Sequence, residues 1–421
     1  MASADQLIAS LQGIDASSFA NEAERIRARD AVFEALRRIQ SPWDLAWDQN
    51  WANPATNAAI QTLAEAGVFK KWAEAGDEPI TCTKLAELTG ADALLIRMFA
   101  VLLRMHGQDT DTPVGRMMRL IAGQCLVTET AEDTYARTPW AKALADDPAF
   151  ASMYGGFYHE LNNPLFHGLP AYLKKTGFRN PTDVNNCNFQ HWRGEGANFF
   201  HYIGTNALLT SPFNDTMECH SKYNLTPWVD IYPTDTVVAA KREDSSSPRP
   251  LVVDIGGGKG HDLKKFLARH PDVPAGSLVL QDLPDFLKGV EADLAGAGAA
   301  IAVRPHDFFT PQPAESRGAR VYFMHNVLHD WPDETARKIL QTLAPAMEKG
   351  YSRLLIHESL VNSVKPLARV TVSDITMMAC LAAAERSEEQ WRELVESAGL
   401  RVVKIWRPVQ SVESIIEVEV A

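Results

Sequence analysis

The sequence predicts an α/β protein in which a mainly helical first half precedes a doubly wound, mostly parallel seven-stranded sheet. After about residue 245, short apolar runs alternate with helical patterns, as in sheets that carry helices on both faces. A glycine-rich turn joins the first of these runs to the next helical pattern, an arrangement typical of nucleotide-binding folds. Before residue 245, apolar side chains recur mostly at helical spacing.

Three stretches carry the helical pattern of the first half. Residues 21–39 and 53–69 have apolar side chains at helical spacing with charged residues between them. Residues 80–108 read as two helices separated at Thr89-Gly90, which suits either a helix-turn-helix or helix packing in a dimer. The acidic net charge of the chain favours packing over DNA binding.

Seven strands are expected in the second half. They cover residues 251–256, 277–283, 300–309, 319–328, 353–360, 401–406 and 414–420. Helical segments separate the first five strands, so these strands should run parallel. The connection between the last two strands is too short for a crossover, and we expect that pair to be antiparallel.

The chain is long enough for two or three domains. Its 421 residues exceed what one small core can organise. The polar residues 241–250, with three serines and two prolines, read as a linker. We therefore predict domains at residues 1–135, 136–245 and 246–421, the second of them a substrate-binding and lid region.

The turn after the first strand of the second half predicts a ligand. Gly256, Gly258 and Gly260 let the backbone turn sharply and approach a bound molecule, and they lead into the positive end of a helix over residues 261–270. His261 stands where the dinucleotide fingerprint requires glycine, so the match to that fingerprint is incomplete.

Polar or aromatic residues at three successive strand ends make the ligand more specific. Asp254 precedes the glycine turn and suits a cationic or amine-bearing group. Asp282 ends the second strand, where an acid typically accepts hydrogen bonds from ribose hydroxyls. Asp307-Phe308 at the end of the third strand suits the amine and the face of an adenine. Together they favour S-adenosylmethionine over NAD.

Three segments resemble one enzyme family. Residues 250–421 resemble small-molecule O-methyltransferases related to caffeic acid O-methyltransferase, and residues 325–334 within them, HNVLHDWPDE, match the catalytic segment of that family. Residues 177–192 and 213–233 resemble the fungal branch of the family. The resemblance implies a helical N-terminal half with a winged-helix dimerisation region. It also implies a doubly wound sheet with an antiparallel last strand that carries S-adenosylmethionine.

By this resemblance His329 is the general base, and Glu358 and Glu385 orient it. The roles make physical sense, because a carboxylate bonded to the far ring nitrogen fixes the tautomer of a histidine and stabilises its imidazolium. The sequence departs from the family at two places. His325 stands where a basic residue is usual, and Ala383-Ala384 replaces a glycine-lysine pair.

The remaining site residues are predicted from the pattern of residues at the strand ends and from the family resemblance. The predicted cofactor-binding residues are Asp254, Gly256, Gly257, Gly258, Asp282, Leu283, Asp307, Phe308 and His325. The predicted acceptor-binding residues are His159, Phe213, Asn214, Met217, Asp330, Met377 and Met378. No metal site is expected.

The predicted reaction is methyl transfer from S-adenosylmethionine to a hydroxyl of a polyketide or another aromatic or enolic metabolite. The alternative is a pericyclase or dehydratase on the same fold, in which the cofactor acts through its charge and no methyl group moves. Some fungal proteins of this fold are of that second kind, and they tend to carry a cationic residue in place of the catalytic histidine.

Composition bears on partners and location. The net charge of −12 disfavours nucleic acid and anionic membranes as partners. We see no signal peptide and no membrane-spanning segment, and the five scattered cysteines suit a reducing compartment. We therefore expect a cytoplasmic homodimer that acts on a small molecule.

Overall fold

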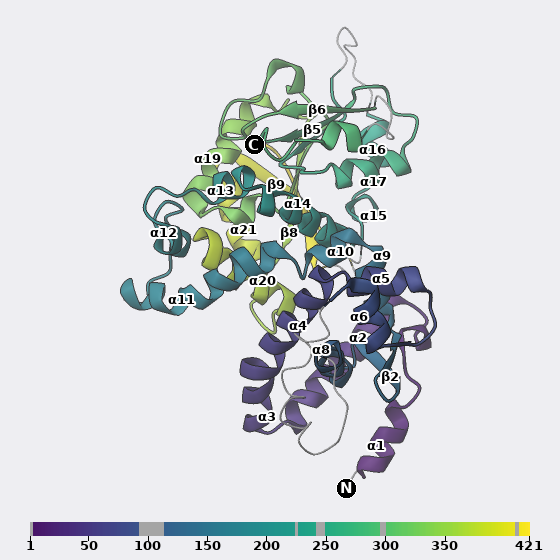
Figure 1. Ribbon diagram of the computed structural model, residues 1–421. Helices are drawn as coiled ribbons and strands as arrows, with labels where there is room; N and C mark the ends of the chain where they lie inside the picture. Colours follow the sequence, from purple (N-terminus) through teal and green to yellow (C-terminus); the bar gives the residue numbers. More distant parts are fainter. Residues whose placement is uncertain (1–2, 92–112, 224–225, 241–248, 295–299, 409–411) are drawn as a thin grey trace. The chain divides into compact units, whose positions relative to one another are not determined.

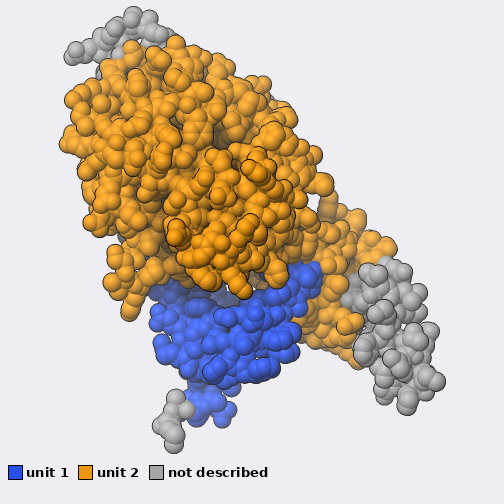
Figure 2. All heavy atoms as spheres, turned by 90° about the vertical axis from the view of Figure 1, so that its left-hand side faces the viewer, with its two compact units in different colours: residues 1–60 blue, residues 61–421 orange. Residues whose placement is uncertain are grey.

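The computed structural model describes residues 3–91, 113–223, 226–240, 249–294, 300–408 and 412–421. The chain divides into two compact units, Met1–Ile60 and Gln61–Ala421, which Figure 2 distinguishes by colour. The domain boundaries expected near residues 135 and 245 stay predictions, and most of the expected linker lies outside the described residues.

The first unit is helical. Its segments are α1 (Ala4–Leu11), η1 (Ala16–Ser18), α2 (Glu22–Ile39), α3 (Pro42–Trp47), η2 (Asp48–Ala52) and the first part of α4 (Asn53–Glu65). Side-chain caps explain where three of these helices begin, because Ser3, Asn21 and Ser41 each accept a hydrogen bond from a backbone N–H of the first turn. Many apolar side chains of this unit are exposed, and the indoles of Trp43, Trp47 and Trp51 lie against one another.

The second unit begins with a winged-helix arrangement. Its helices are α5 (Val68–Ala75), α6 (Cys82–Thr89) and α8 (Pro113–Gly123), and its small antiparallel sheet has the order β1 (Ile80–Thr81), β3 (Thr134–Arg137), β2 (Val127–Ala131). The helical stretch expected over residues 53–69 is divided, because Gly67 takes a left-handed conformation (φ 74°) between α4 and α5. The helix expected after Gly90 lies outside the described residues.

Short helices follow the winged helix as far as residue 238. They are α9 (Pro139–Asp146), α10 (Pro148–Ser152), η4 (Phe157–Asn162), α11 (Asn163–Lys175), α12 (Asn188–Arg193), α13 (Phe199–Thr205), α14 (Ala207–Lys222), α15 (Trp228–Ile231) and α16 (Asp235–Val238). Phe157, Leu165 and Phe189 pack in one apolar cluster with Ala379 and Leu381, which come from a helix close to the C-terminus. Segments far apart in sequence therefore share this core.

A seven-stranded sheet organises the remainder (Figure 1). Its strand order is β6-β5-β4-β7-β8-β10-β9. The strands are β4 (Val252–Ile255), β5 (Leu278–Asp282), β6 (Ile301–Pro305), β7 (Val321–His325), β8 (Arg353–Ser359), β9 (Leu400–Trp406) and β10 (Glu413–Val420). The first five strands are parallel to one another, and β10 is antiparallel to both β8 and β9. The predicted doubly wound fold and its antiparallel last strand are confirmed.

Helices cover both faces of this sheet (Figure 1). They are α17 (His261–Arg269), α18 (Val290–Asp293), α19 (Asp333–Leu343) and α21 (Glu388–Ser397), with short turns η6 (Ala314–Ser316), η7 (Leu328–Asp330) and η8 (Ala344–Ala346). Helix α20 (Ala368–Leu381) packs instead against η4, α11, α12 and η7. Ile339 of α19 and Trp391 of α21 pack on one face. Trp228 of α15 and Phe266 of α17 stack on the other, with ring centroids 5.7 Å apart.

The carboxyl ends of the parallel strands all reach one edge of the sheet. In open α/β sheets this edge is where ligands bind. The glycine turn follows β4 there, and η7 with His329 follows the neighbouring strand β7. Among the described helices, none combines the length and the apolar character needed to cross a bilayer.

Candidate active site

The glycine turn between β4 and α17 is a cradle that excludes side chains. Gly256, Gly258 and Gly260 have positive φ angles of 74°, 52° and 68°. At Gly257 a Cβ atom would lie 2.5 Å from the Leu280 side chain and closer still to the carboxylate of Asp254. The turn therefore requires glycine at consecutive positions, which leaves its backbone open to a ligand.

Two acids face this turn, Asp254 buried and Asp282 half-buried. Asp282 accepts hydrogen bonds from the backbone N–H of Gly258 (2.9 Å) and of Leu283 (2.7 Å), and burial raises its pKa to about 6. Asp254 is 1% exposed, and its Oδ2 has no hydrogen-bond partner among the described residues. The pKa of Asp254 is raised well above its ordinary value, mainly by burial and then by the negative charge of Asp262.

These observations fit an adenosine-type cofactor. The cradle offers backbone without side chains, and an unpartnered carboxyl oxygen is available to a polar ligand. Each oxygen of Asp282 keeps a second lone pair, so the carboxylate can still accept from ribose hydroxyls. Asp307 and Phe308 follow β6 at the same edge, and the Phe308 ring lies edge-on to Trp331 at 6.0 Å.

The glycine turn is also tied to helix α14. Lys259 forms ion pairs with Asp215 and Glu218 of α14, the second at 3.2 Å. Burial lowers the pKa of Lys259, but Asp215 and Glu218 raise it above its ordinary value overall, so its charge is secure. Since α14 also carries Asn214 and Met217, the cofactor cradle and the predicted acceptor side are directly connected.

His329 lies in η7 between two buried glutamates. Its Nδ1 is 2.9 Å from Oε1 of Glu385 and 3.7 Å from Oε2 of Glu358. Oε1 of Glu385 also accepts from the Ser373 hydroxyl at 2.6 Å. The side chain of His329 is 10% exposed, whereas those of both glutamates are fully buried.

The glutamates make His329 a stronger base. Burial lowers its pKa, but Glu358, Glu385 and Asp330 outweigh burial and raise it to about 10. In return, His329 overcomes the effect of burial on Glu385 and lowers the pKa of that acid. A base of this strength matches a phenol, whose ordinary pKa is about 10.

Glu358 also shapes the backbone that carries His329. Its Oε1 accepts hydrogen bonds from the backbone N–H groups of Val327 (3.1 Å), Leu328 (2.9 Å) and His329 (3.3 Å). The same segment touches the glycine turn, because a Cβ atom at Gly256 would lie 2.9 Å from the Val327 side chain. His329 is thus held next to the cofactor cradle by backbone contacts.

Arg386 holds the other side of the His329 segment. It is 3% exposed and donates to the carbonyl oxygens of Leu328 (3.0 Å) and Trp331 (2.6 Å) and to Asp333 (2.8 Å). Because Arg386 follows Glu385 directly, one short segment both pairs with the His329 ring and fixes its backbone. The sequence reasoning missed this residue.

Asp330 presents a second titratable group beside His329. Its Oδ1 lies 3.6 Å from Nε2 of His329, the ring nitrogen that faces away from the glutamates. Burial raises its pKa to about 7, although His329 acts in the opposite direction. The geometry places Asp330 next to the nitrogen that would accept a proton.

The predicted acceptor residues lie in the apolar helical core. Phe213 packs edge-on to Phe157 at 5.2 Å, and Asn214 donates to the carbonyl oxygen of Phe286 at 3.4 Å. Met217 and Met377 border the same cluster, while Met378 is half-buried. His159 of η4 is half-buried, and its Nε2 has no partner among the described residues.

His325, which was predicted as a cofactor-binding residue, has a carboxylate partner at each ring nitrogen. Its Nδ1 is 2.6 Å from Asp262 and its Nε2 is 3.0 Å from Glu413, so carboxylates engage both ring nitrogens.

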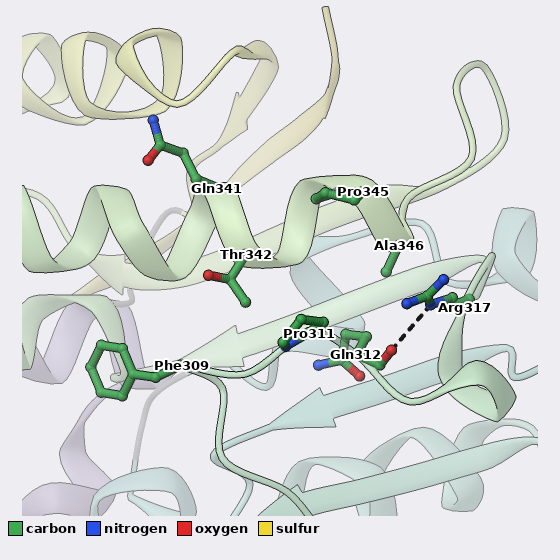
Figure 3. Close-up of a pocket in the computed structure, with 8 residues that line it drawn as sticks. All are labelled: Phe309, Pro311, Gln312, Arg317, Gln341, Thr342, Pro345 and Ala346. Atoms are coloured by element: carbon green, nitrogen blue, oxygen red, sulfur yellow. Dashed lines mark hydrogen bonds between the residues drawn. The ribbon is translucent and has the colours of Figure 1, made fainter.

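A hollow of about 410 Å³ opens elsewhere in the second unit (Figure 3). It lies between the segment after β6 and α19, and its lining residues are Phe309, Pro311, Gln312, Arg317, Gln341, Thr342, Pro345 and Ala346. Arg317 donates to the Gln312 carbonyl at 3.1 Å. None of the predicted site residues lines this hollow.

The fold and the site together define a class I methyltransferase. The sequence pattern of the O-methyltransferase domain matches residues 178–401, more than half of the chain. The chain belongs to the O-methyltransferase family, which uses S-adenosylmethionine as its cofactor. The resemblance stated from the sequence is confirmed.

Individual relatives extend over nearly the whole chain. Over 98% of its length it is 34% identical to O-methyltransferase mfmE of Annulohypoxylon moriforme, of which it covers 95%. The solved structure of LepI in complex with SAM matches with a TM-score of 0.83 and 25% identity, covering 99% of this chain and 98% of that one. A structure described as a pericyclic reaction enzyme matches with the same values.

Proposed function

We propose that this chain transfers the methyl group of S-adenosylmethionine to a phenolic or enolic hydroxyl of a small secondary metabolite of the polyketide or aromatic class. The observation that carries the proposal is His329 with Glu385 2.9 Å from its Nδ1, next to the glycine cradle. The apolar surroundings of Phe213 and Met217 support an aromatic acceptor.

His329 removes the proton of the acceptor hydroxyl at its Nε2. The pKa of about 10 means that the transfer from a phenol is nearly balanced. Glu385 and Glu358 stabilise the imidazolium that forms, and Glu385 fixes the ring orientation. The cofactor, when bound, supplies an electrophilic methyl group and a positive charge that favours the acceptor oxyanion.

The cofactor site in this proposal consists of the glycine turn with Asp254, Asp282, Asp307 and Phe308. Asp282 serves the ribose hydroxyls, and the Asp307-Phe308 pair serves the adenine. Binding of S-adenosylhomocysteine to wild type and to Asp282→Ala, measured by calorimetry, tests this assignment. Equal affinity in both proteins would remove Asp282 from the site.

A labelling experiment tests the reaction. Purified protein is incubated with methyl-labelled S-adenosylmethionine and a panel of fungal polyketides and phenols, and products are identified by mass spectrometry. We expect a labelled product and S-adenosylhomocysteine from wild type. His329→Ala should lose several orders of magnitude in turnover with nearly unchanged cofactor affinity.

Pericyclase or dehydratase chemistry is the second candidate, and the similarity to a pericyclic reaction enzyme favours it. In that case substrate conversion requires the cofactor, yet no label enters the product and no S-adenosylhomocysteine forms. That result in a protein with intact His329 would refute the methyltransferase proposal.

We further propose a homodimer that forms through the first unit. The support is its unusual number of exposed apolar side chains, which are Leu7, Ile8, Leu11, Ile14, Val32, Phe33, Leu36, Ile39, Trp43, Trp47 and Trp51. Sedimentation at micromolar concentration should show a dimer, and a monomeric wild type would contradict the proposal. Trp47→Ser with Trp51→Ser should shift it to monomer.

We also propose that the protein is located in the cytoplasm. All five cysteines are free thiols in the described part of the chain, which supports the expected cytoplasmic location. Microscopy of a tagged protein in its host tests this location, and a signal confined to another compartment would refute it.

A further inference from the structure

A second polar cluster lies beside the candidate active site and takes no part in the chemistry described above. It consists of His325 at the end of β7, His357 in β8 and Glu413 at the start of β10. His325 and His357 are direct neighbours in the register of two parallel strands, and their rings stack with centroids 4.3 Å apart. Glu413 lies opposite Ser359, two residues beyond His357.

The three side chains converge on one point. Oε2 of Glu413 is 3.0 Å from Nε2 of His325 and 3.6 Å from Nε2 of His357. The ligand atoms of the three residues all lie within 4.8 Å of one another. In a tetrahedral zinc site with bonds of about 2.0–2.2 Å, neighbouring ligand atoms are about 3.3–3.5 Å apart, so the observed spacings suit such an ion.

His357 is the anomaly that points to a missing ligand. It is 1% exposed, and neither of its ring nitrogens has a hydrogen-bond partner among the described residues. A buried polar group without any partner is costly, and native structures rarely retain one.

The groups behind the cluster have the arrangement of an outer coordination shell. Asp262, which is 3% exposed, lies 2.6 Å from Nδ1 of His325, the nitrogen that does not face Glu413. Asn326 donates to the other oxygen of Glu413 at 3.1 Å. Metal-bound histidines usually donate their second ring nitrogen to a carboxylate, and metal-bound carboxylates are themselves hydrogen-bonded.

We propose that His325, His357 and Glu413 bind one divalent transition-metal ion of the zinc class. Two imidazoles and one carboxylate are a donor set that zinc commonly takes. The ion joins strands β7, β8 and β10 and steadies the residue that precedes Asn326–His329, and its fourth coordination position is left to water. The proposal does not depend on which reaction the enzyme catalyses.

Metal analysis of the full-length protein tests the proposal. The protein is stripped with a chelator, exposed to Zn²⁺, desalted and analysed for metal, and Co²⁺ is titrated in parallel while visible absorption is recorded. We expect about one zinc per chain and the absorption bands of four-coordinate Co²⁺. Less than about a tenth of an equivalent in wild type, with no Co²⁺ bands, overturns the proposal.

Variants locate the ion. His357→Phe keeps an aromatic ring and should lose zinc, and Glu413→Gln should also lose it, which guards against one variant failing to fold. His270→Asn is the matched control, because His270 also neighbours an acid, Asp235, at 3.9 Å but has no third ligand. Zinc kept by His357→Phe but lost in His329→Ala would place the ion at the catalytic histidine and refute the proposal.

Discussion

Replacing Glu385 by glutamine should lower the pKa of His329 by about 2 units. The carboxylates around this ring raise its pKa from 6.5 to about 10 against the opposing effect of burial. That rise corresponds to about 5 kcal/mol in favour of the imidazolium, at about 1.36 kcal/mol per unit. Glu385, at 2.9 Å, is nearer than Glu358, and one adjacent opposite charge usually contributes about 1–3 units.

An NMR titration of histidine labelled with carbon-13 in the imidazole ring measures this shift without a substrate. The spectrum of His329→Ala identifies the signal. In wild type the ring should stay protonated through neutral pH, and in Glu385→Gln its midpoint should fall to about pH 8. Glu334→Gln, at an exposed glutamate on α19, is the control and should leave the midpoint unchanged.

The sign of the shift also fixes the pH dependence of activity. Only neutral imidazole can accept the acceptor proton, so the rate of wild type should rise with pH towards the pKa of His329. Wild type and Glu385→Gln act on the same acceptor, so the ionisation of that acceptor contributes equally to the pH-rate profiles of the two proteins. A wild-type midpoint near 6.5, or identical midpoints in wild type and Glu385→Gln, would refute the reasoning.

Three further predictions concern the cradle and its supports. Gly257→Ala should lower the free energy of unfolding by about 1–3 kcal/mol through overpacking, and it should weaken S-adenosylhomocysteine binding at least tenfold by calorimetry. Gly123→Ala is the control and should do neither, because a Cβ atom at Gly123 meets no neighbour. Arg386→Met removes one of two hydrogen bonds to the Leu328 carbonyl and the Arg386 hydrogen bond to the Trp331 carbonyl, so it should lower both kcat and Tm, while Arg392→Met on the surface should not. An unchanged kcat would contradict the positioning role of Arg386. Burial raises the pKa of Asp282 to about 6, so the affinity for the cofactor should fall as the pH drops through 6. Asp282→Asn should abolish this pH dependence. A flat affinity profile in wild type would show that the ionised carboxylate takes no part in binding.

The sheet was predictable because its evidence is local. Each apolar run of the second half became a strand, and the short connection before Glu413 correctly indicated an antiparallel pair. The division of the helical stretch at Gly67 was also readable in principle, since glycine is the residue that takes a left-handed conformation at a helix boundary. That signal was overlooked.

Long-range contacts were not predictable in the same way. The resemblance to a family brought His329, Glu358 and Glu385 to attention, and the structure places them together. Arg386 contacts carbonyls 55 and 58 residues away, and backbone acceptors leave no trace in a sequence. Likewise, His325 meets Asp262 and Glu413 only because three separate elements converge at one edge of the sheet.

The ion pairs of Lys259 have a consequence for how the two ligands influence each other. Lys259 belongs to the cofactor cradle, and its partners Asp215 and Glu218 belong to α14, the helix that carries the proposed acceptor residues Asn214 and Met217. A change in the cradle that shifts Lys259 therefore changes the free energy of the acceptor side. Thermodynamic linkage makes such an effect reciprocal, so the factor by which S-adenosylhomocysteine alters acceptor affinity must equal the factor by which the acceptor alters its affinity.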